Sequence, residues 1–286
     1  MDPLRPLYLQ KLDLCQFRNY TELSIAFSPA INCLTGPNGS GKTNVLDAIH
    51  YLAFTRGFRS SQDPQAVQEE TSFFLSKAEV MRDGVSRTVE CNFVKGKGKK
   101  ILVNQKPVER LSEHIGQIPL VTVLPQDTDL INGPAEDRRR FLDMIISQYD
   151  PAYLRELIRY ERALTQRNAL IRSFLRAHTW DSEQLELWAG QMLAPAVAIR
   201  AGRERFLEEF MPLFESFFHR IVSESETPAL AYLSQTTENT PDAWYRQILS
   251  ANDKDRALGY TSSGIHRDDL QFRINGRTVR HYGSQG

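Results

Sequence analysis

The residues best suited to chemistry form one glycine-rich run, Gly36-Pro37-Asn38-Gly39-Ser40-Gly41-Lys42-Thr43. The run fits the pattern G-x-x-x-x-G-K-[ST]. Glycines allow backbone N–H groups to turn toward phosphate oxygens, because no Cβ stands in the way. The lysine of this pattern reaches the β- and γ-phosphates, and the hydroxyl of the last residue coordinates Mg²⁺. The run therefore predicts a nucleotide-binding loop with Lys42 at the phosphates and Thr43 at the metal.

The elements that must position this loop are a strand before it and a helix after it. Residues 31–35 form a compact, largely apolar run that ends at Gly36, which predicts a short strand. Residues 45–52 place Val45, Ala48 and Leu52, with Leu46 and Ile49, on one helical face. The N-terminus of such a helix offers free N–H groups and the positive end of its dipole to an anion. This context favours a phosphate site over a coincidental glycine turn.

Strand patterns flank the loop in the first part of the chain. Residues 7–17 and 23–27 alternate apolar and polar residues, and residues 73–108 do so between turns. Asp83-Gly84 is typical of a hairpin, and Gly96 and Gly98 predict a flexible tip. Residues 118–124 are apolar enough for a buried strand.

The middle of the chain changes to helical patterns. Apolar residues between Tyr153 and Phe174 recur in steps of four and three, broken at Arg167, which predicts a helix packed on another helix. Residues 184–222 form the expected partner, with Pro195 and Pro212 predicting kinks or breaks. Residues 259–286 return to strand-like chemistry, with a second hairpin turn at 275–276.

Bulk composition excludes several classes of protein. The chain has 35 basic and 35 acidic residues, and this neutrality neither supports nor excludes binding to nucleic acid, since a local patch suffices. No apolar stretch approaches the length of a membrane helix, and the N-terminus lacks a secretory signal pattern. Cys15, Cys33 and Cys91 lie far apart and predict buried thiols rather than a metal site or disulfides. A cytoplasmic protein is expected.

Several motifs, in order along essentially the whole chain, resemble those of the RecF family, which belongs with the SMC-like ABC ATPases. They are Phe17-Arg18-Asn19-Tyr20, residues 36–60, Leu124-Pro125-Gln126-Asp127, residues 132–134 with 138–143, residues 264–270, and residues 282–286. The resemblance implies an α/β fold, namely a P-loop ABC-type ATPase head with a mixed or parallel sheet and an inserted α-helical lobe. The implied parts are residues 1–112 of the head, a Q-loop strand and lobe over 113–250, and a return to the head over 251–286.

The resemblance also implies roles for individual residues. Gln126 matches the catalytic Q-loop residue, which senses Mg²⁺ and the γ-phosphate. Arg18 resembles an N-terminal arginine that reaches the nucleotide phosphates. Ser284, Gln285 and Gly286 resemble the start of the signature motif, which in relatives contacts the γ-phosphate bound by the opposite subunit.

The implied cofactors are ATP and Mg²⁺, with the metal at Thr43 and Gln126. The implied partners are DNA (single-stranded, gapped or duplex), a second copy in an ATP-dependent homodimer, and mediators of the RecO and RecR type. A location at the nucleoid follows, with roles in recombinational repair, replication and the SOS response.

Two departures from the family pattern stand out. Ile265 occupies a position where the family commonly has proline, and the chain stops inside the signature motif, before any Walker B aspartate, catalytic glutamate or D-loop. The expectation is therefore weak nucleotide binding with slow or no hydrolysis, and a sheet that lacks a central strand. Asp127 could hold magnesium in a simpler P-loop kinase, but its surroundings match the Q-loop better.

Basic residues are candidates for DNA contact. The cluster Lys95-Gly96-Lys97-Gly98-Lys99-Lys100 suits phosphates and a solvated hairpin end equally well. Arg138-Arg139-Arg140 follows a helix start, and successive helical residues point in different directions, so one or two of them are expected at a nucleotide, DNA or dimer surface. The named DNA candidates are Lys97, Lys99, Lys100, Arg138 and Arg139.

His266 beside Asp268 and Asp269 fits a catalytic base or switch, but a histidine that organises its loop through hydrogen bonds is favoured.

Three functions remain open at this point. The first is a RecF-like ATP-dependent clamp on DNA, in which ATP drives closure of a dimer. The second is a pseudo-ATPase that keeps the nucleotide cradle without turnover, and the third, less favoured, is a small-molecule P-loop kinase. ATP-dependent DNA retention separates the first from the third, and turnover separates the first from the second.

Overall fold

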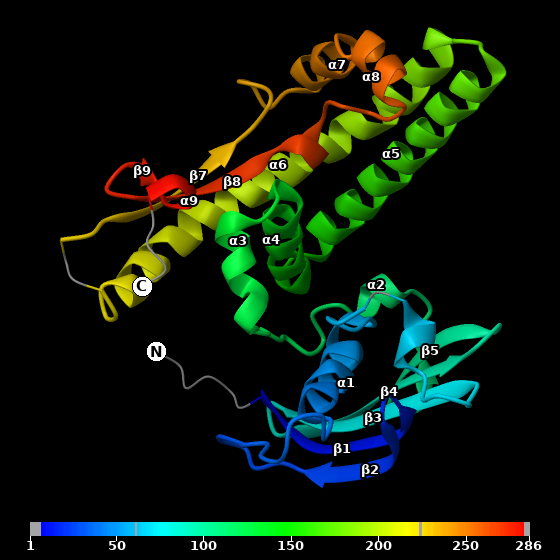
Figure 1. The fold of residues 1–286 in the computed structure, drawn as a ribbon, viewed down its shortest axis with the longest axis vertical. Coiled ribbons are helices and arrows are strands. Elements are labelled where there is room, and N and C mark those ends of the chain that lie inside the picture. The colour runs from blue at the N-terminus through cyan, green and yellow to red at the C-terminus, as the bar shows by residue number, and fades with distance from the viewer. Residues whose placement is uncertain (1–6, 61, 223–224, 283–286) are drawn as a thin grey trace. The chain divides into compact units, whose positions relative to one another are not determined.

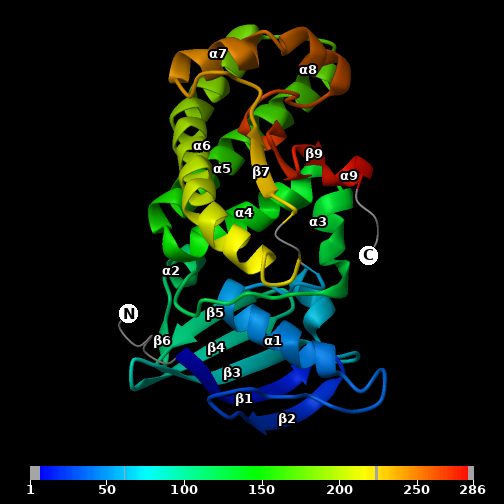
Figure 2. The same cartoon turned by 90° about the vertical axis from the view of Figure 1, so that its left-hand side faces the viewer.

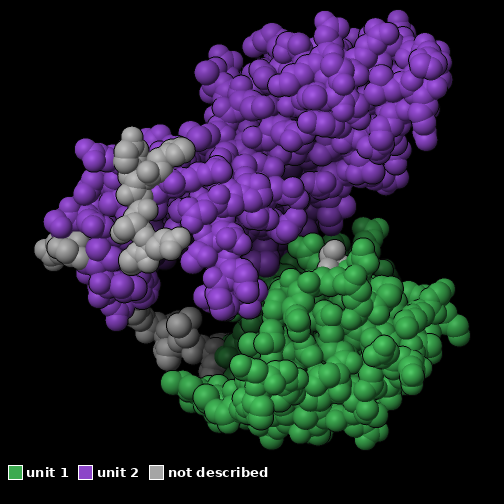
Figure 3. Space-filling view, viewed as in Figure 1, with its two compact units in different colours: residues 1–122 green, residues 123–286 purple. Residues whose placement is uncertain are grey.

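A computed structural model describes residues 7–60, 62–222 and 225–282, with the side chains of 281 and 282 left undescribed. Its contacts divide the chain once, into residues 1–122 and residues 123–286, which Figure 3 colours separately. The parts expected from the sequence had boundaries after residues 112 and 250, and that division stays a prediction.

The first unit contains a six-stranded sheet in which every pair of neighbouring strands is antiparallel (Figure 1). Its order is β2 (Tyr20–Ala26), β1 (Leu7–Phe17), β3 (Phe73–Arg82), β4 (Val85–Val94), β5 (Gly98–Val103) and β6 (Lys106–Pro107). The hairpin turn at Asp83-Gly84 is confirmed, and both residues have positive φ, as a tight hairpin between twisted strands requires. The glycine tip joins β4 to β5 as expected.

Helix α1 (Lys42–Phe54) covers one face of this sheet (Figure 2). The alternation of β1 directs Leu12 and Leu14 to that face, and the positive φ of Gln16 (54°) breaks the alternation before Phe17. All three pack with α1 residues in one core. Phe17, Tyr51 and Phe74 meet edge to face, with ring centroids 5.2 to 5.7 Å apart. Leu46, expected on the buried face, is exposed, because the covered stripe is narrower than the apolar pattern.

Two segments expected to be strands are irregular instead. Residues 31–35 and 118–124 belong to no strand, and the exposed fractions are 94% for Ile31, 74% for Val121 and 81% for Val123. A strand needs a neighbour to complete its backbone hydrogen bonds, and no described strand pairs with either segment. The expected parallel part of the sheet is therefore not formed among the described residues. The short elements η1 (Asp63–Ala66) and α2 (Leu111–His114) complete this unit.

The second unit is built on a helical hairpin. Helix α5 (Pro151–Ala177) packs along α6 (Ser182–Phe218), and the carboxylates of Asp150 and Asp181 cap their first turns. Helix α4 (Ala135–Tyr149) packs beside them, preceded by η2 (Pro125–Thr128) and α3 (Asp129–Asn132). The predicted packed helices, and a helix start just before Arg138, are confirmed.

Neither proline breaks the second long helix, and a kink at either one stays a prediction. Helix α6 continues through both Pro195 and Pro212. Each proline removes one hydrogen bond of the helix, but Pro195 is buried among the helices, so packing offsets that loss. Pro212 lies only two turns from the helix end, where fewer residues depend on continuity.

A three-stranded antiparallel sheet lies beside these helices (Figure 1). Its order is β7 (Pro228–Leu233), β8 (Asp269–Ile274) and β9 (Arg277–Thr278). The predicted turn at Asn275-Gly276 joins the last two. The remaining elements are α7 (Pro241–Leu249), α8 (Asn252–Leu258), η3 (Ile265–Arg267) and α9 (Val279–Tyr282).

The break in the helical pattern at Arg167 has a structural cause. Arg167 and Asp255 are both fully buried, and Arg167 Nη1 lies 2.6 Å from Asp255 Oδ2. The guanidinium also donates to Thr261 Oγ1 and Asn252 Oδ1. This ion pair ties α5 to α8 through the helical core, at a position where the pattern expects an apolar side chain.

The three cysteines differ in their surroundings. Cys91 is buried, as expected, Cys15 is half-buried, and Cys33 is exposed, which corrects the prediction of three buried thiols. Cys33 is exposed because its segment is not taken into a sheet. No group of metal-binding side chains gathers among the described residues, and none of the described helices is long and apolar enough to cross a membrane.

Candidate nucleotide site and basic surfaces

The glycine-rich loop ends directly at α1. Residues 36–40 are exposed, and the helix begins at Lys42 with no acidic side chain in its first turn. Lys42 Nζ donates to the carbonyl oxygens of Gly36, at 2.8 Å, and Pro37, at 2.7 Å. The ammonium group is thus folded back over the loop.

Two residues of the first strand pair support the loop from outside. Asn19 Nδ2 and Tyr20 Oη both donate to the carbonyl oxygen of Ser40, at 3.4 and 3.3 Å. Gly41 has φ +100°, and a Cβ there would lie 2.6 Å from Tyr20 Oη and 2.7 Å from Asn19. Glycine tolerates this positive φ and has no Cβ to contact Asn19 and Tyr20. The two supporting side chains can therefore approach the loop only because residue 41 is a glycine.

A second line of hydrogen bonds fixes the start of α1. Asn44 Nδ2 donates to Asn19 Oδ1 at 2.7 Å, and Arg59 Nη1 donates to Asn44 Oδ1 at 2.7 Å. Sequence reasoning did not single out Asn44 or Arg59. No pattern in the sequence signals this line, because its members are brought together only by the fold.

Arg18, a predicted phosphate ligand, is engaged within the protein. Its Nη2 and Nε lie 2.7 and 3.1 Å from Asp47 Oδ2, and its Nη1 donates to the carbonyl of Gln65 at 2.8 Å. The other oxygen of Asp47 accepts the backbone N–H groups of Phe58 and Arg59. A role for Arg18 at the phosphates stays a prediction. Asp47 could have been found from sequence, since an acid on an apolar helix face needs a partner.

The residues of the loop fit a nucleotide phosphate and its magnesium ion. The loop is open to solvent, the helix end carries no competing carboxylate, and Lys42 makes only hydrogen bonds to carbonyls, which phosphate oxygens could replace. Thr43 is exposed at the first turn of α1, where its hydroxyl could serve as a metal ligand.

The other predicted nucleotide residues lie outside this unit. Gln126 is exposed in η2 of the second unit, and its assignment to the Q-loop stays a prediction. Asp127 Oδ2 accepts the backbone N–H of Leu124 at 2.7 Å, so it stabilises the turn locally. Ser284, Gln285 and Gly286 lie outside the described residues.

The predicted DNA residues fall into two groups. Lys97 and Lys100 are exposed at the β4–β5 hairpin. Lys99 instead pairs with Asp63, at 2.8 Å, and is largely buried. Among these three lysines the geometry favours Lys97 and Lys100 for contact with a polyanion, and that contact stays a prediction.

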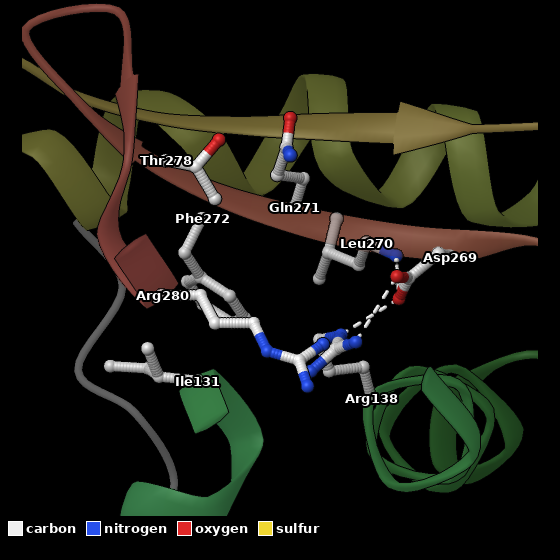
Figure 4. A pocket seen from close by; sticks show the side chains of 8 residues that line it. All are labelled: Ile131, Arg138, Asp269, Leu270, Gln271, Phe272, Thr278 and Arg280. Carbon is white, nitrogen blue, oxygen red and sulfur yellow. Dashed lines mark hydrogen bonds and ion pairs between the residues drawn. The ribbon is translucent and has the colours of Figure 1, made fainter. Parts of the chain in front are cut away.

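Arg138 and Arg139 are also engaged within the protein. Arg138 is buried in a two-bond ion pair with Asp269, at 2.7 and 3.1 Å, beside a pocket of about 100 Å³ (Figure 4). The pocket is lined by Ile131, Arg138, Asp269, Leu270, Gln271, Phe272, Thr278 and Arg280. Arg139 Nη1 donates to the carbonyl of Asp268 at 2.6 Å, while Arg140 lies at the surface with Glu136. Contact of Arg138 or Arg139 with DNA stays a prediction, and it would require these bonds to open.

His266 organises its loop, as favoured by the sequence. Its Nδ1 accepts from Tyr160 Oη at 2.7 Å, and its Nε2 donates to the carbonyl of Thr261 at 3.0 Å. Burial lowers the pKa of His266 from 6.5 to about 4, so the ring is neutral at pH 7. A Cβ at Gly264, whose φ is +138°, would lie 2.5 Å from Tyr160 Oη. Both ring nitrogens are occupied, which leaves none free to act as a base.

Arg203 holds the same loop from the other side. Its Nε and Nη2 donate to Asp143 at 3.0 Å each, and its Nη1 donates to the carbonyl of Ile265 at 3.3 Å. Two further acidic residues near Arg203 have shifted pKa values: desolvation raises the pKa of Glu161 and of Asp268. The residues 264–270 are thus anchored to α4, α5 and α6 by buried polar contacts.

Comparisons with known proteins agree with the motifs. The family described as "RecF/RecN/SMC N terminal domain" matches residues 8–114. The "DNA replication and repair protein RecF" of Flavobacterium johnsoniae is 40% identical over 281 residues, covering 98% of this chain and 77% of that protein. The protein of the same name from Parabacteroides distasonis is 37% identical over 280 residues, covering 98% of this chain and 75% of that protein.

Solved structures give the same result for the fold. A structure described as the "recombination mediator protein RecF-ATP in RecFOR pathway" has a TM-score of 0.91 and 26% identity, covering 100% of this chain and 78% of that chain. An Smc head domain from Pyrococcus furiosus has a TM-score of 0.50 and 17% identity, covering 98% of this chain and 75% of that chain, a likeness of fold alone.

Proposed function

The chain belongs to the RecF family of DNA replication and repair proteins, and on this premise we propose that it is an ATP-binding, DNA-binding repair protein. The observation that carries the proposal is the glycine-rich loop at the N-terminus of α1, with the Lys42 ammonium folded over it. The likeness to a RecF-ATP structure supports ATP as the nucleotide.

The residues of the loop suggest how binding proceeds. The Lys42 ammonium leaves the carbonyls of Gly36 and Pro37 and donates to phosphate oxygens, which carry more negative charge and form stronger hydrogen bonds. The N–H groups at the start of α1 donate to the same phosphates, while Thr43 supplies a hydroxyl to the metal. Bound ATP would supply phosphate oxygens, which carry the negative charge that Lys42 and the helix N–H groups bind. The same oxygens would coordinate Mg²⁺ together with Thr43. Asn19 and Tyr20 keep the loop in place while Lys42 moves.

The finer function that we propose follows the family. Two copies would close on single-stranded or gapped DNA as an ATP-dependent clamp, with the ABC signature at Ser284 facing the nucleotide of the partner. Such a clamp would act with RecO- and RecR-type mediators in recombinational repair, replication and the SOS response. The relatives named for replication and repair, and the solved structure named for the RecFOR pathway, support this proposal.

The test is DNA binding by the chain at fixed salt, measured by fluorescence anisotropy with and without ATP and Mg²⁺. Lys42→Ala should weaken ATP binding about 10- to 100-fold, since hydrogen bonds to a charged group contribute about 1.5 to 3 kcal/mol. It should also abolish the ATP-dependent part of DNA binding. The matched control is Lys254→Ala, an exposed lysine of α8. DNA binding that is equal with and without ATP, or unchanged in Lys42→Ala, would contradict the proposal.

A further inference from the structure

Helix α5 carries a row of arginines on the side opposite its packed face. Its buried residues, among them Tyr160, Leu164 and Ile171, face α6 and its neighbours. At about 3.6 residues per turn, five arginines fall within an arc of about 140° opposite these residues. They are Arg155, Arg159, Arg162, Arg172 and Arg176, and all five are exposed. We call these five residues the α5 arginine row.

Most of the row is free of intramolecular partners. Arg159 pairs with Glu156 at 2.9 Å, a contact exposed to solvent. The other four make no hydrogen bond or ion pair with any residue that the structure describes. The helix contains only one further acidic residue, Glu161, which lies at the edge of the row, and desolvation raises its pKa. The row therefore presents several unneutralised charges of one sign.

From the row's length, charge and lack of apolar surface we propose that it binds the phosphate backbone of duplex DNA. Arg155 and Arg176 are 21 positions apart, which is about 31 Å along a straight helix. Duplex DNA carries about one charge per 1.7 Å of its axis, so about 18 phosphates lie along that length. A rigid row of cations matches a rigid rod of anions, and the arginine forks suit phosphate oxygens.

The row lacks what a protein partner would need. Interfaces between proteins have an apolar core, but among the arginines of the row the one exposed large apolar side chain is Ile158, which is 46% exposed. The positions between the arginines include Thr165, Gln166, Ala169 and Ser173, which are small or uncharged. These residues neither repel phosphates nor specify a base, so the contact is independent of DNA sequence.

This inference rests on the proposed DNA-binding function and names the surface that would carry it. The test compares the chain with two double variants, Arg155→Gln/Arg162→Gln and Arg172→Gln/Arg176→Gln. Glutamine keeps a high helix propensity, and the replaced side chains are exposed, so the melting temperature should not change. The control double variant, Arg87→Gln/Arg246→Gln, removes the same charge from exposed sites on β4 and α7.

Binding to a labelled duplex is measured by anisotropy between 50 and 200 mM salt, with ATP and Mg²⁺ present. Each lost phosphate contact reduces the slope of log K against log salt by about 0.9, so each row variant should lose about 1.8 from that slope. Between 50 and 200 mM salt, the factor by which the affinity of each row variant falls should be about 12 times smaller than the factor for the unmodified chain. Duplexes of unrelated sequence should give the same change.

A slope in both row variants equal to that of the unmodified or control chain overturns the inference alone. Absence of duplex binding by the unmodified chain also overturns this inference. Absence of binding to single-stranded and gapped DNA as well overturns the DNA-binding function itself.

Discussion

The buried ion pair between Arg167 and Asp255 allows a sharp test of how the second unit is held together. Both side chains are fully buried, and Arg167 donates to Asp255, Thr261 and Asn252. Arg167→Met removes all three bonds and leaves a buried carboxylate, which still accepts two hydrogen bonds from Ser262. Removing one partner of a buried pair costs about 3–5 kcal/mol, because the remaining charge is uncompensated.

The double variant separates the charge pairing from local packing. Asp255→Asn alone leaves a buried guanidinium and should also cost about 3–5 kcal/mol. In Arg167→Met/Asp255→Asn neither charge remains, so the loss in unfolding free energy should be smaller than the sum of the singles by about 2 kcal/mol or more.

The assay is urea unfolding followed by tryptophan fluorescence. All three tryptophans, Trp180, Trp188 and Trp244, belong to the second unit, so the signal reports on that unit. The control is the exposed pair Arg159 and Glu156, for which the same cycle should give less than about 0.5 kcal/mol of coupling. Additive single variants at Arg167 and Asp255 would refute the assignment of a buried, mutually compensating pair.

Three further predictions follow from the structure. Burial lowers the pKa of His266 from 6.5 to about 4, so between pH 6.5 and pH 4 the unfolded chain binds a proton that the native chain does not. The unfolding free energy, followed by tryptophan fluorescence, should therefore fall by about 3 kcal/mol from pH 7 to pH 4 through this group. His266→Gln should flatten the dependence of the unfolding free energy on pH over this range. The raised pKa of Asp268 has the opposite effect, because it adds stability as the pH falls. Asp268 is present in both chains, so subtracting the pH profile of His266→Gln from that of the unmodified chain removes its contribution. Gly41→Ala should reduce ATP binding measured by calorimetry at least about tenfold, because the new Cβ would clash with Asn19 and Tyr20 and displace the loop; an unchanged affinity would contradict this support. Cys33 should react quickly with a thiol reagent in the native chain and Cys91 only after unfolding, since Cys91 is buried and burial raises its pKa to about 12; equal rates, measured by mass spectrometry, would contradict the fold of the first unit.

Local patterns were sufficient for the longest described helices and for the hairpin turns. The helical pattern around Tyr153 predicted α5, and the dipeptides at 83–84 and 275–276 predicted turns that the structure contains. These features depend on residues close together in sequence, where periodicity and turn chemistry act directly. The role of Lys42 at the phosphates was predicted in the same way, because its motif is contiguous, and it stays a prediction.

Only the tertiary structure decided which polar residues are engaged and which are free. Arg18, Lys99 and Arg138 are basic residues that the sequence offers for phosphate, yet each is held by an acid 29 to 131 positions away. Asn19 and Asn44 at the loop, 25 positions apart, and Arg167 and Asp255 in the core, 88 positions apart, likewise meet only in the folded chain. Residues 31–35 and 118–124 are apolar enough for strands but pair with no described neighbour. Sequence pattern determines what a segment can form by itself, whereas ion pairs and sheet ladders need a second segment whose position only folding sets.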